Sequence, residues 1–356
     1  MRSARDRARW RLTTLALLIS AAAASSAQPR AVGEALGRPA VTVRGAERAV
    51  LLSASRADKR LVAVGERGIV VLSDDEGLSW RQAATPTSVT LTAVHFTDRD
   101  GWAVGHGGVV LASSDRGERW TVQLDGRRAA QTVLEAARSS NDPKALSEAQ
   151  RLVAEGADKP FMDIVVRGER KLLAVGAYGL ALASEDGGKS WVSWVPRLPN
   201  PKGLHLYAAR QRGDKLLLAG EQGLVLLSTD GGSSFRRIDT PYKGTFFAAE
   251  FLGDQDIVLA GLRGNALRSL DGGTTWAPIA SPMPVSITAS ALDVDGRLVS
   301  ANQAGFVMSL QADQLVPSNG KPLPAINGLL PLGGGKALAL TVQGAKLVDM
   351  VPAGTR

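Results

Sequence analysis

Short apolar runs separated by glycine turns recur along most of the chain. In the clearest copy, residues 172–184, an apolar strand ends at Gly176, turns through two residues to Gly179 and returns as a second apolar strand. Short apolar runs bounded by glycine are typical of antiparallel strands joined by tight turns. The same hairpin is found at 62–73, 102–113, 217–228 and 258–269, and in weaker form at 299–309 and 338–348.

The second glycine of each hairpin gives the period of the repeat. These glycines are spaced 40, 71, 44, 41, 41 and 39 residues apart. A period of about 40–45 residues is that of a four-stranded propeller blade, and the longest interval equals one period plus an insertion of about 30 residues. We therefore predict an all-β fold, a seven-bladed β-propeller. The glycines are Gly68, Gly108, Gly179, Gly223, Gly264, Gly305 and Gly344.

A second motif, S-x-D-x-G-x-x-W, follows five of the hairpins, and Phe235 replaces Trp in one copy. The Asp can accept backbone hydrogen bonds within a turn, the Gly permits positive φ, and the aromatic ring is suited to burial between blades. We call 73–80, 113–120, 184–191, 228–235 and 269–276 the Asp turns. One carboxylate at the same turn of each blade predicts a structural role. These carboxylates are Asp75, Asp115, Asp186, Asp230 and Asp271.

Residues 125–159 have helical rather than strand periodicity. Their apolar positions recur at spacings of three and four residues, which indicates amphipathic helices. The pair Asp142-Pro143 predicts the start of a second helix, and Gly156 predicts its end. We predict a helical hairpin inserted between blades two and three. Its apolar positions are Val133, Leu134, Ala137, Leu146, Ala149, Leu152 and Val153.

The first 27 residues resemble a secretory signal peptide. Five arginines precede a short apolar run at 12–24, and Ser25-Ser26-Ala27 offers a cleavage site near Ala27. The run is too short for a membrane anchor. A chain without cysteine suits export to a bacterial periplasm. We therefore expect a periplasmic protein in which residues 28–356 form one propeller domain.

Removal of the leader changes the charge balance. The leader contains five Arg and one Asp, so its net charge of +4 accounts for half of the formal +8. The remaining charge is spread over the chain rather than gathered in a basic patch. A mildly basic surface of this kind does not indicate a nucleic-acid partner.

The two ends of the propeller pattern are incomplete. The last hairpin has no evident fourth strand, whereas Ala40–Val43 has the pattern of a lone strand before the first hairpin. We predict that residues 40–43 supply the missing strand of blade seven. This pairing would close the ring and cover two sheet edges.

Propeller topology predicts which residues share a face. In each blade, the turn between strands two and three and the link to the next blade lie on one face, which we call the hairpin-turn face; the Asp turns lie on the other. The glycines of these turns recur from blade to blade, whereas the residues between them differ. Such variable turn residues on a rigid scaffold are suited to partner binding. We expect the helical insertion to join this face and to cap part of the central channel. The predicted partner-binding residues are Arg67, His106, Tyr178, Gln222, Arg263, Gln303 and Gln343, with Arg127 and Arg128 from the insertion.

The Asp turns, with the hairpin that opens Gly101-Trp-Ala-Val-Gly105, resemble those of Asp-box (BNR) propellers. More closely, the chain resembles the photosystem II assembly and stability factor family of seven-bladed propellers over nearly all of its mature length. This resemblance implies a non-catalytic protein that holds a subunit and assists assembly of a membrane complex. The missing cysteine and the helical insertion depart from the family pattern and point to a non-photosynthetic bacterial relative. We expect a monomer, peripheral to the membrane at most.

The alternative is a glycan-binding or sialidase-like glycoside hydrolase propeller, since sialidases also carry Asp boxes. Their chemistry uses a Tyr nucleophile, with an arginine triad and acidic residues. The chain has three Tyr and no Arg-Ile-Pro signature, and its three His lie on different repeats without metal-ligand spacing. We therefore expect a protein that is not an enzyme and that has no catalytic, cofactor or metal residues.

Overall fold

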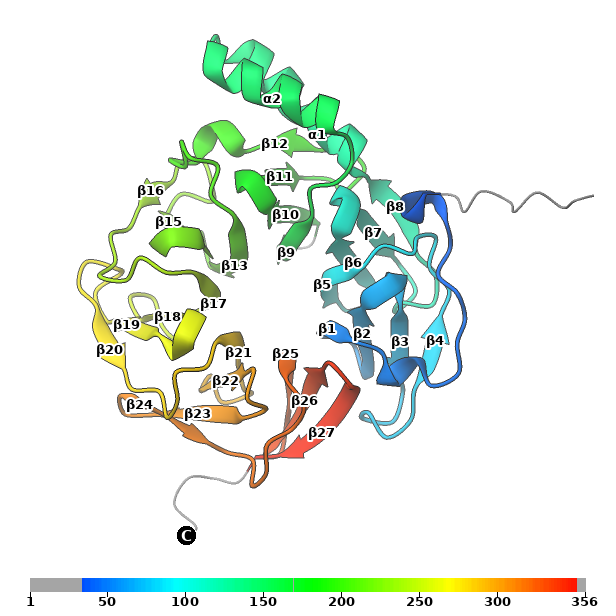
Figure 1. Ribbon diagram of the computed structural model, residues 1–356, viewed down its shortest axis with the longest axis vertical. Coiled ribbons are helices and arrows are strands. Elements are labelled where there is room, and N and C mark those ends of the chain that lie inside the picture. Colours follow the sequence, from blue (N-terminus) through cyan, green and yellow to red (C-terminus); the bar gives the residue numbers. More distant parts are fainter. Residues whose placement is uncertain (1–33, 169, 351–356) are drawn as a thin grey trace, which may run out of the picture. The chain divides into compact units, whose positions relative to one another are not determined.

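Seven antiparallel sheets surround a central channel in the computed structural model, which describes residues 34–168 and 170–350 (Figure 1). Six of these sheets have four strands, and the seventh has three. The strands of each sheet follow one another in sequence order, from the channel outward. The predicted seven-bladed propeller is confirmed. The predicted signal peptide, residues 1–27, lies outside the described residues.

The strands have the following bounds. Blade one contains β1 (Leu51–Ala57), β2 (Arg60–Gly65), β3 (Val70–Ser73) and β4 (Arg81–Ala83); blade two contains β5 (Leu91–Thr97), β6 (Asp100–Gly105), β7 (Val110–Ser113) and β8 (Thr121–Leu124). Blade three contains β9 (Phe161–Arg167), β10 (Lys171–Gly176), β11 (Ala181–Ser184) and β12 (Val192–Ser193); blade four contains β13 (Leu206–Arg212), β14 (Lys215–Gly220), β15 (Val225–Ser228) and β16 (Arg236–Arg237). Blade five contains β17 (Phe246–Phe251), β18 (Ile257–Gly261), β19 (Ala266–Ser269) and β20 (Ala277–Ile279); blade six contains β21 (Ile287–Leu292), β22 (Leu298–Asn302), β23 (Val307–Gln311) and β24 (Gln314–Pro317). Blade seven contains β25 (Ile326–Gly333), β26 (Lys336–Thr341) and β27 (Gly344–Asp349).

The core lies between neighbouring blades. Along β2 and β3 of blade one, side chains alternate between two apolar clusters: Val64 and Val70 pack toward blade two, whereas Ala63 and Val71 pack toward blade seven. Both faces of the middle strands are therefore buried. This burial explains why these strands are continuously apolar instead of alternating between polar and apolar residues.

The predicted strand exchange between the ends of the propeller is wrong. Residues 40–43 form no strand and lie along blade one: the Ala40 N–H donates to the Thr85 carbonyl, and the Gln82 side chain bonds to the backbone of Val41 and Val43. Blade seven consequently has three strands within residues 34–168 and 170–350.

The ring closes through side-chain packing instead. Leu51 and Leu61 of blade one and Leu338 and Leu340 of blade seven are fully buried in one cluster. The Asn327 side chain also donates to the Leu51 carbonyl at 3.1 Å. Burial of apolar area is non-directional, so the last blade can close on the first as each blade packs on its neighbour.

The predicted helical hairpin is confirmed as α1 (Gly126–Ser139) and α2 (Pro143–Glu155). Asp125 caps α1 by accepting from the Arg128 N–H, and Asp142 caps α2 by accepting from the Lys144 N–H. The hairpin lies outside the ring, beside β12, and does not cover the channel (Figure 1). The predicted capping is therefore wrong, because α1 continues from the outermost strand of blade two and packs outward of blade three. No helix of the described residues has the length and apolar character needed to cross a membrane.

Each Asp turn is held by its own side chains. In the first, the Asp75 carboxylate accepts from the Ser73 hydroxyl and from the backbone N–H and hydroxyl of Ser79, and the Ser73 hydroxyl accepts from the Gly77 N–H. Donation from Ser79 lowers the pKa of Asp75 to about 2. Asp186 and Asp271 lie in equivalent networks, and their pKa values are also lowered to about 2.

The aromatic residue completes three of these turns. The indole N–H of Trp80, Trp120 and Trp191 donates to the carbonyl of the Gly three residues before it. Phe235 has no such donor. In its turn, the guanidinium of Arg197 donates to the Gly232 carbonyl at 2.9 Å from the neighbouring blade.

An ion-pair network connects the inner strands of blades three to six. Arg210 donates to Asp163 at 2.7 Å and to Glu250 at 2.9 Å, and the Ser290 hydroxyl donates to Glu250 at 3.0 Å. Burial raises the pKa of Glu250 despite the facing guanidinium. Arg210 thus compensates two carboxylates that face the channel.

We expect removal of this cation to destabilise the ring. Arg210→Met should lower the free energy of unfolding by about 3 kcal/mol, because it leaves two carboxylates without their counter-charge. The control Arg212→Ala breaks an exposed pair with Asp254 and should cost at most about 1 kcal/mol. Urea denaturation measures both values. Equal effects of the two variants would show that the channel network does not stabilise the fold.

The Asp turns predict a loss of stability in acid. A folded-state pKa of about 2, below the ordinary 3.8, means that these carboxylates contribute fully above about pH 4 and lose their contribution as the pH falls toward 2. Asp75→Asn should therefore lower the melting temperature at pH 7 and have less effect near pH 2. Asp313→Asn is the control, since the Asp313 carboxylate accepts no hydrogen bond among the described residues. A pH-independent effect of Asp75→Asn would contradict this account.

Candidate protein-binding face

The hairpin turns and the blade-to-blade links meet on one face, as predicted. The glycine that ends each turn packs on the backbone of the following link: a Cβ on Gly68 would lie 2.1 Å from the Thr87 carbonyl oxygen, and one on Gly223 would lie 2.2 Å from that of Tyr242. A larger residue would therefore push the turn off the link. The Asp turns instead hydrogen-bond to the turns between strands one and two, as in the bond from the Gly187 N–H to the Arg170 carbonyl.

The predicted turn residues are exposed on this face, and several have an unusual backbone. Arg67, Tyr178, Gln222 and Arg263 have φ between 52° and 57°, a left-handed conformation that non-glycine residues seldom adopt. Positions of this kind often belong to functional surfaces, where the surrounding structure maintains the strain. In blade two the position is occupied by Gly107, so His106 lies one residue earlier in its turn. The exposed turn residues are Arg67, His106, Tyr178, Gln222, Arg263, Gln303 and Gln343.

The two predicted arginines of the insertion are held at the start of α1. Arg127 is paired with Glu34 at 2.6 Å. The Arg128 guanidinium donates to the Gln123 carbonyl at 2.9 Å. Both side chains thus bind other segments of the same chain, beside blade two. Of the nine predicted partner-binding residues, Tyr178 alone lines the groove that the helical hairpin forms with blade three.

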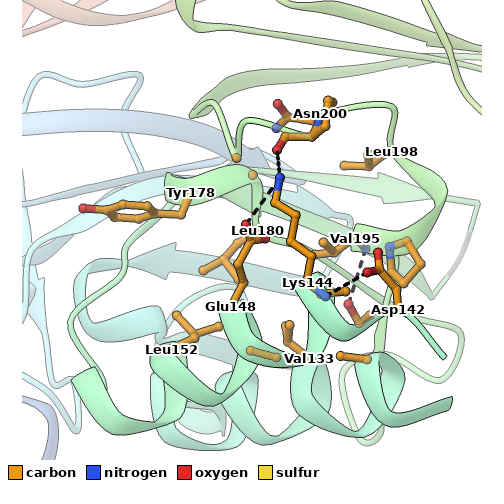
Figure 2. Close-up of a pocket in the computed structure, with 18 of the residues that line it drawn as sticks. Val133, Asp142, Lys144, Glu148, Leu152, Tyr178, Leu180, Val195, Leu198 and Asn200 are labelled. Carbon is orange, nitrogen blue, oxygen red and sulfur yellow. Dashed lines mark hydrogen bonds and ion pairs between the residues drawn. The ribbon is translucent and has the colours of Figure 1, made fainter. Parts of the chain in front are cut away.

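A groove is associated with this face. It has a volume of about 570 Å³ and lies between the helical hairpin and the link that follows blade three (Figure 2). Figure 2 shows Val133 and Leu152 from the helices on one side and Leu180, Val195 and Leu198 from the propeller on the other. We call this hollow the hairpin groove. Its walls are apolar side chains from elements that are separate in sequence.

Charged residues surround these apolar walls. Lys144 reaches from α2 to the Pro201 carbonyl at 3.2 Å and lies 3.8 Å from Glu148, so it crosses one end of the groove. At the other end, the Lys159 ammonium lies 4.9 Å from the centre of the Tyr178 ring. Burial disfavours the charged form of Lys159, but Asp158 and Glu155 outweigh it and raise its pKa. The groove therefore combines an apolar floor with fixed charges at its rim.

A row of aromatic rings leads from the groove toward the channel. The Tyr178 and His205 rings lie 4.9 Å apart, His205 and Tyr207 lie 6.3 Å apart, and Tyr207 and Phe247 lie 5.3 Å apart. We call these four residues the aromatic track. Tyr178 is 52% exposed and the other three are half-buried, so the ring faces remain partly available to a ligand. Burial and the nearby Glu221 raise the pKa of Tyr207.

The groove and most of the track were not predicted from the sequence. Tyr207 and Phe247 occupy the second position of the innermost strands of blades four and five, where blades two and six have Thr92 and Thr288. Alignment of the repeats could have detected these two aromatics. The groove had no comparable signal, because its walls meet only when the link 194–204 folds against α2.

The fold and these surfaces can be compared with known proteins. Residues 142–317 match the family described as photosynthesis system II assembly factor YCF48. The structure of YCF48 bound to D1 peptide is 15% identical, with a TM-score of 0.63, over 87% of this chain and 95% of that chain. YCF48 from Cyanidioschyzon merolae is 17% identical, with a TM-score of 0.63, over 86% and 97% of the two chains.

A propeller from another family is similar in fold as well. The WD40 propeller domain of Doa1 is 11% identical, with a TM-score of 0.63, over 89% of this chain and 98% of that chain. No curated protein sequence matches the chain. Likeness at these identities shows the propeller fold, whereas the family match adds the type of propeller. Residues 142–317 thus match the photosystem II assembly factor family, and the solved structures share the propeller fold of the whole chain.

Proposed function

We propose that this protein is a non-catalytic propeller that binds a segment of a protein partner and assists the assembly or stability of a membrane-associated complex. The observation that carries this proposal is the hairpin groove, which continues into the aromatic track on the hairpin-turn face. A relative described as bound to D1 peptide supports a protein partner for this kind of propeller.

The hairpin groove has the properties of a preformed binding site. Its volume of about 570 Å³ lies within the usual range for ligand sites, about 300–1,000 Å³, and both apolar and charged side chains line it. Rigid, half-exposed aromatic rings provide contact area at a small entropic cost, which is why Tyr is frequent among the residues that dominate binding energy. A peptide could place an apolar side chain in the groove and continue across the track.

We further propose that the protein is exported and acts in the periplasm as a monomer. The basic, apolar and small-residue regions of residues 1–27 support export. Membrane association would then come through the partner.

The glycosidase alternative is less favoured by the sequence, which has three Tyr and no Arg-Ile-Pro signature. We therefore expect no turnover of sialosides or aryl glycosides above a blank.

Site-specific photo-crosslinking in the source organism tests the binding proposal. A photoreactive residue at Tyr178 should form adducts with a protein identified by mass spectrometry. The same residue at Leu78, which is 78% exposed on the Asp-turn face, is the control. Equal labelling from both positions, or no protein adduct from Tyr178, would contradict a partner at the groove.

A pair of substitutions then measures the contribution of the groove. Tyr178→Ala should weaken binding of the identified partner by about tenfold or more, because aromatic anchors often contribute about 2 kcal/mol. Gln222→Ala is matched, since Gln222 occupies the same turn position with φ of 52° but does not line the groove. Equal losses would indicate binding across the whole face, and no loss would exclude the groove.

A third variant tests the insertion as a unit. Replacement of residues 127–159 by a short Gly-Ser linker should keep the propeller folded, because the blades resume in register at β9, and should abolish partner capture. Circular dichroism and co-purification measure these two outcomes. An unfolded product would show that the hairpin belongs to the core, and full capture would show that it is dispensable.

A further inference from the structure

Among the described residues, blade seven has an open sheet edge where the other six blades have a fourth strand. Its third strand, β27, pairs with β26 through the register Thr341↔Gly344 to Lys336↔Asp349. On its other side, no main-chain group of the described residues hydrogen-bonds to residues 344–349. In blades one to six, this position is occupied by a fourth strand.

The open edge leaves a large apolar side chain exposed. Leu347 lies opposite Leu338, on the rung where blade one has Leu72 and blade four has Leu227. Leu72 and Leu227 are 1% and 4% exposed, whereas Leu347 is 40% exposed. The difference follows from the fourth strand, because Leu72 faces Arg81 across a strand pair and Leu347 has no such partner.

The other blades show which backbone groups of β27 are available. In blades three and four, the carbonyls of Ala181 and Val225 accept from the N–H of the outer residues Trp194 and Ile238, both at 2.8 Å. Ala345 occupies the equivalent rung of blade seven. In an antiparallel ladder the direction of these groups alternates, so Ala345, Leu347 and Asp349 direct their N–H and C=O groups toward the open edge.

The fourth strands of the other blades indicate which side chains an added strand would place at the open edge. The outer residues opposite the Ala345 rung include Ala83, Leu124 and Ile279, which are 5%, 1% and 4% exposed. A strand at this edge should therefore bury one aliphatic side chain at that rung.

The next rung of β27 differs from its counterparts. Lys346 stands where the covered blades have Val71, Leu111 or Leu267. An opposite charge directly across a strand pair is stabilising. Lysine also discourages unselective edge pairing, so Lys346 favours an incoming strand with an acidic residue on this rung.

We propose that the open edge of blade seven binds an extended segment of another protein by strand addition, antiparallel to β27, with an acidic residue opposite Lys346 followed by an aliphatic residue opposite Ala345. Main-chain bonds to Ala345 and Leu347 supply affinity, and the two neighbouring rungs supply selectivity. This site is distinct from the hairpin groove. It goes beyond the proposed function by defining a second point of attachment and the chemistry of its ligand.

A synthetic peptide tests the proposal directly. Fluorescein-labelled Thr-Arg-Glu-Ile-Thr should bind the purified protein saturably in fluorescence polarisation and should protect the amides of Ala345 and Leu347 from hydrogen exchange. Leu347→Pro should weaken this binding by about tenfold or more, because it removes a donor directed at the edge and not one used by β26. Leu347→Val is the control and should bind normally. Melting curves of both variants establish that the propeller remains folded.

A charge exchange keeps the proposal testable even if the proline variant is unfolded. Lys346→Glu should weaken binding of the glutamate peptide by about three- to fivefold, the size of a cross-strand charge pair. A peptide with lysine in place of the glutamate should show the reverse preference for this variant. Such a reciprocal exchange requires the proposed register and would not arise from a general loss of stability.

Other occupants of the edge give different results. A peptide affinity that neither Leu347→Pro nor Lys346→Glu changes would overturn the proposal. Protection of the Ala345 and Leu347 amides without peptide in a monomer would overturn it in favour of the chain's own segments. A concentration-dependent dimer that Leu347→Pro dissociates would overturn it in favour of a second copy. Tyr178→Ala should retain peptide binding, so failure at this edge is distinguishable from failure at the groove.

Discussion

Apolar packing between neighbouring blades is the interaction on which the rest of the structure depends. No blade can bury both of its faces alone, and each does so against the two beside it. The clusters that join blade one to blade two and blade one to blade seven are built from alternate residues of the same strands. Because this interaction needs matched surfaces rather than particular bonds, it also closes the ring between the first and last blades.

Polar interactions support this packing at the turns between strands and at the innermost strands. The Asp turns satisfy backbone groups where strands reverse, so the aromatic residue can enter the space between blades. In the turn with Phe235, the aromatic ring packs between blades although it cannot donate a hydrogen bond to the Gly232 carbonyl. Arg197, which follows the adjacent blade, donates to that carbonyl instead. In the channel, Arg210 joins three blades by pairing with Asp163 and Glu250.

The two surfaces that we propose for binding lie where the repeat is broken. The helical hairpin interrupts the link between blades two and three, and its outer position creates a groove that no regular link would form. In the described part of the chain, blade seven has three strands, so one edge is open and Leu347 is exposed. Two local departures from the repeat thus give a nearly symmetric ring two distinct candidate sites, and the packed blades hold both in place.

The sequence by itself determined the number of blades, their strands and the existence of the helical hairpin, because these follow from local periodicity, glycine turns and helix caps. It also predicted that the turn residues from Arg67 to Gln343 share one face, since that follows from chain order.

Only the tertiary structure decided where residues 40–43 pair, how the ring closes and on which side α1 and α2 pack. These outcomes depend on competition between surfaces that are distant in sequence. The side chain of Gln82 bonds to residues 41 and 43, which would otherwise suit pairing with β27. The apolar face of α1 packs on blade three rather than over the channel. The hairpin groove and the aromatic track belong to the same class, because their walls come from elements whose proximity no local pattern encodes.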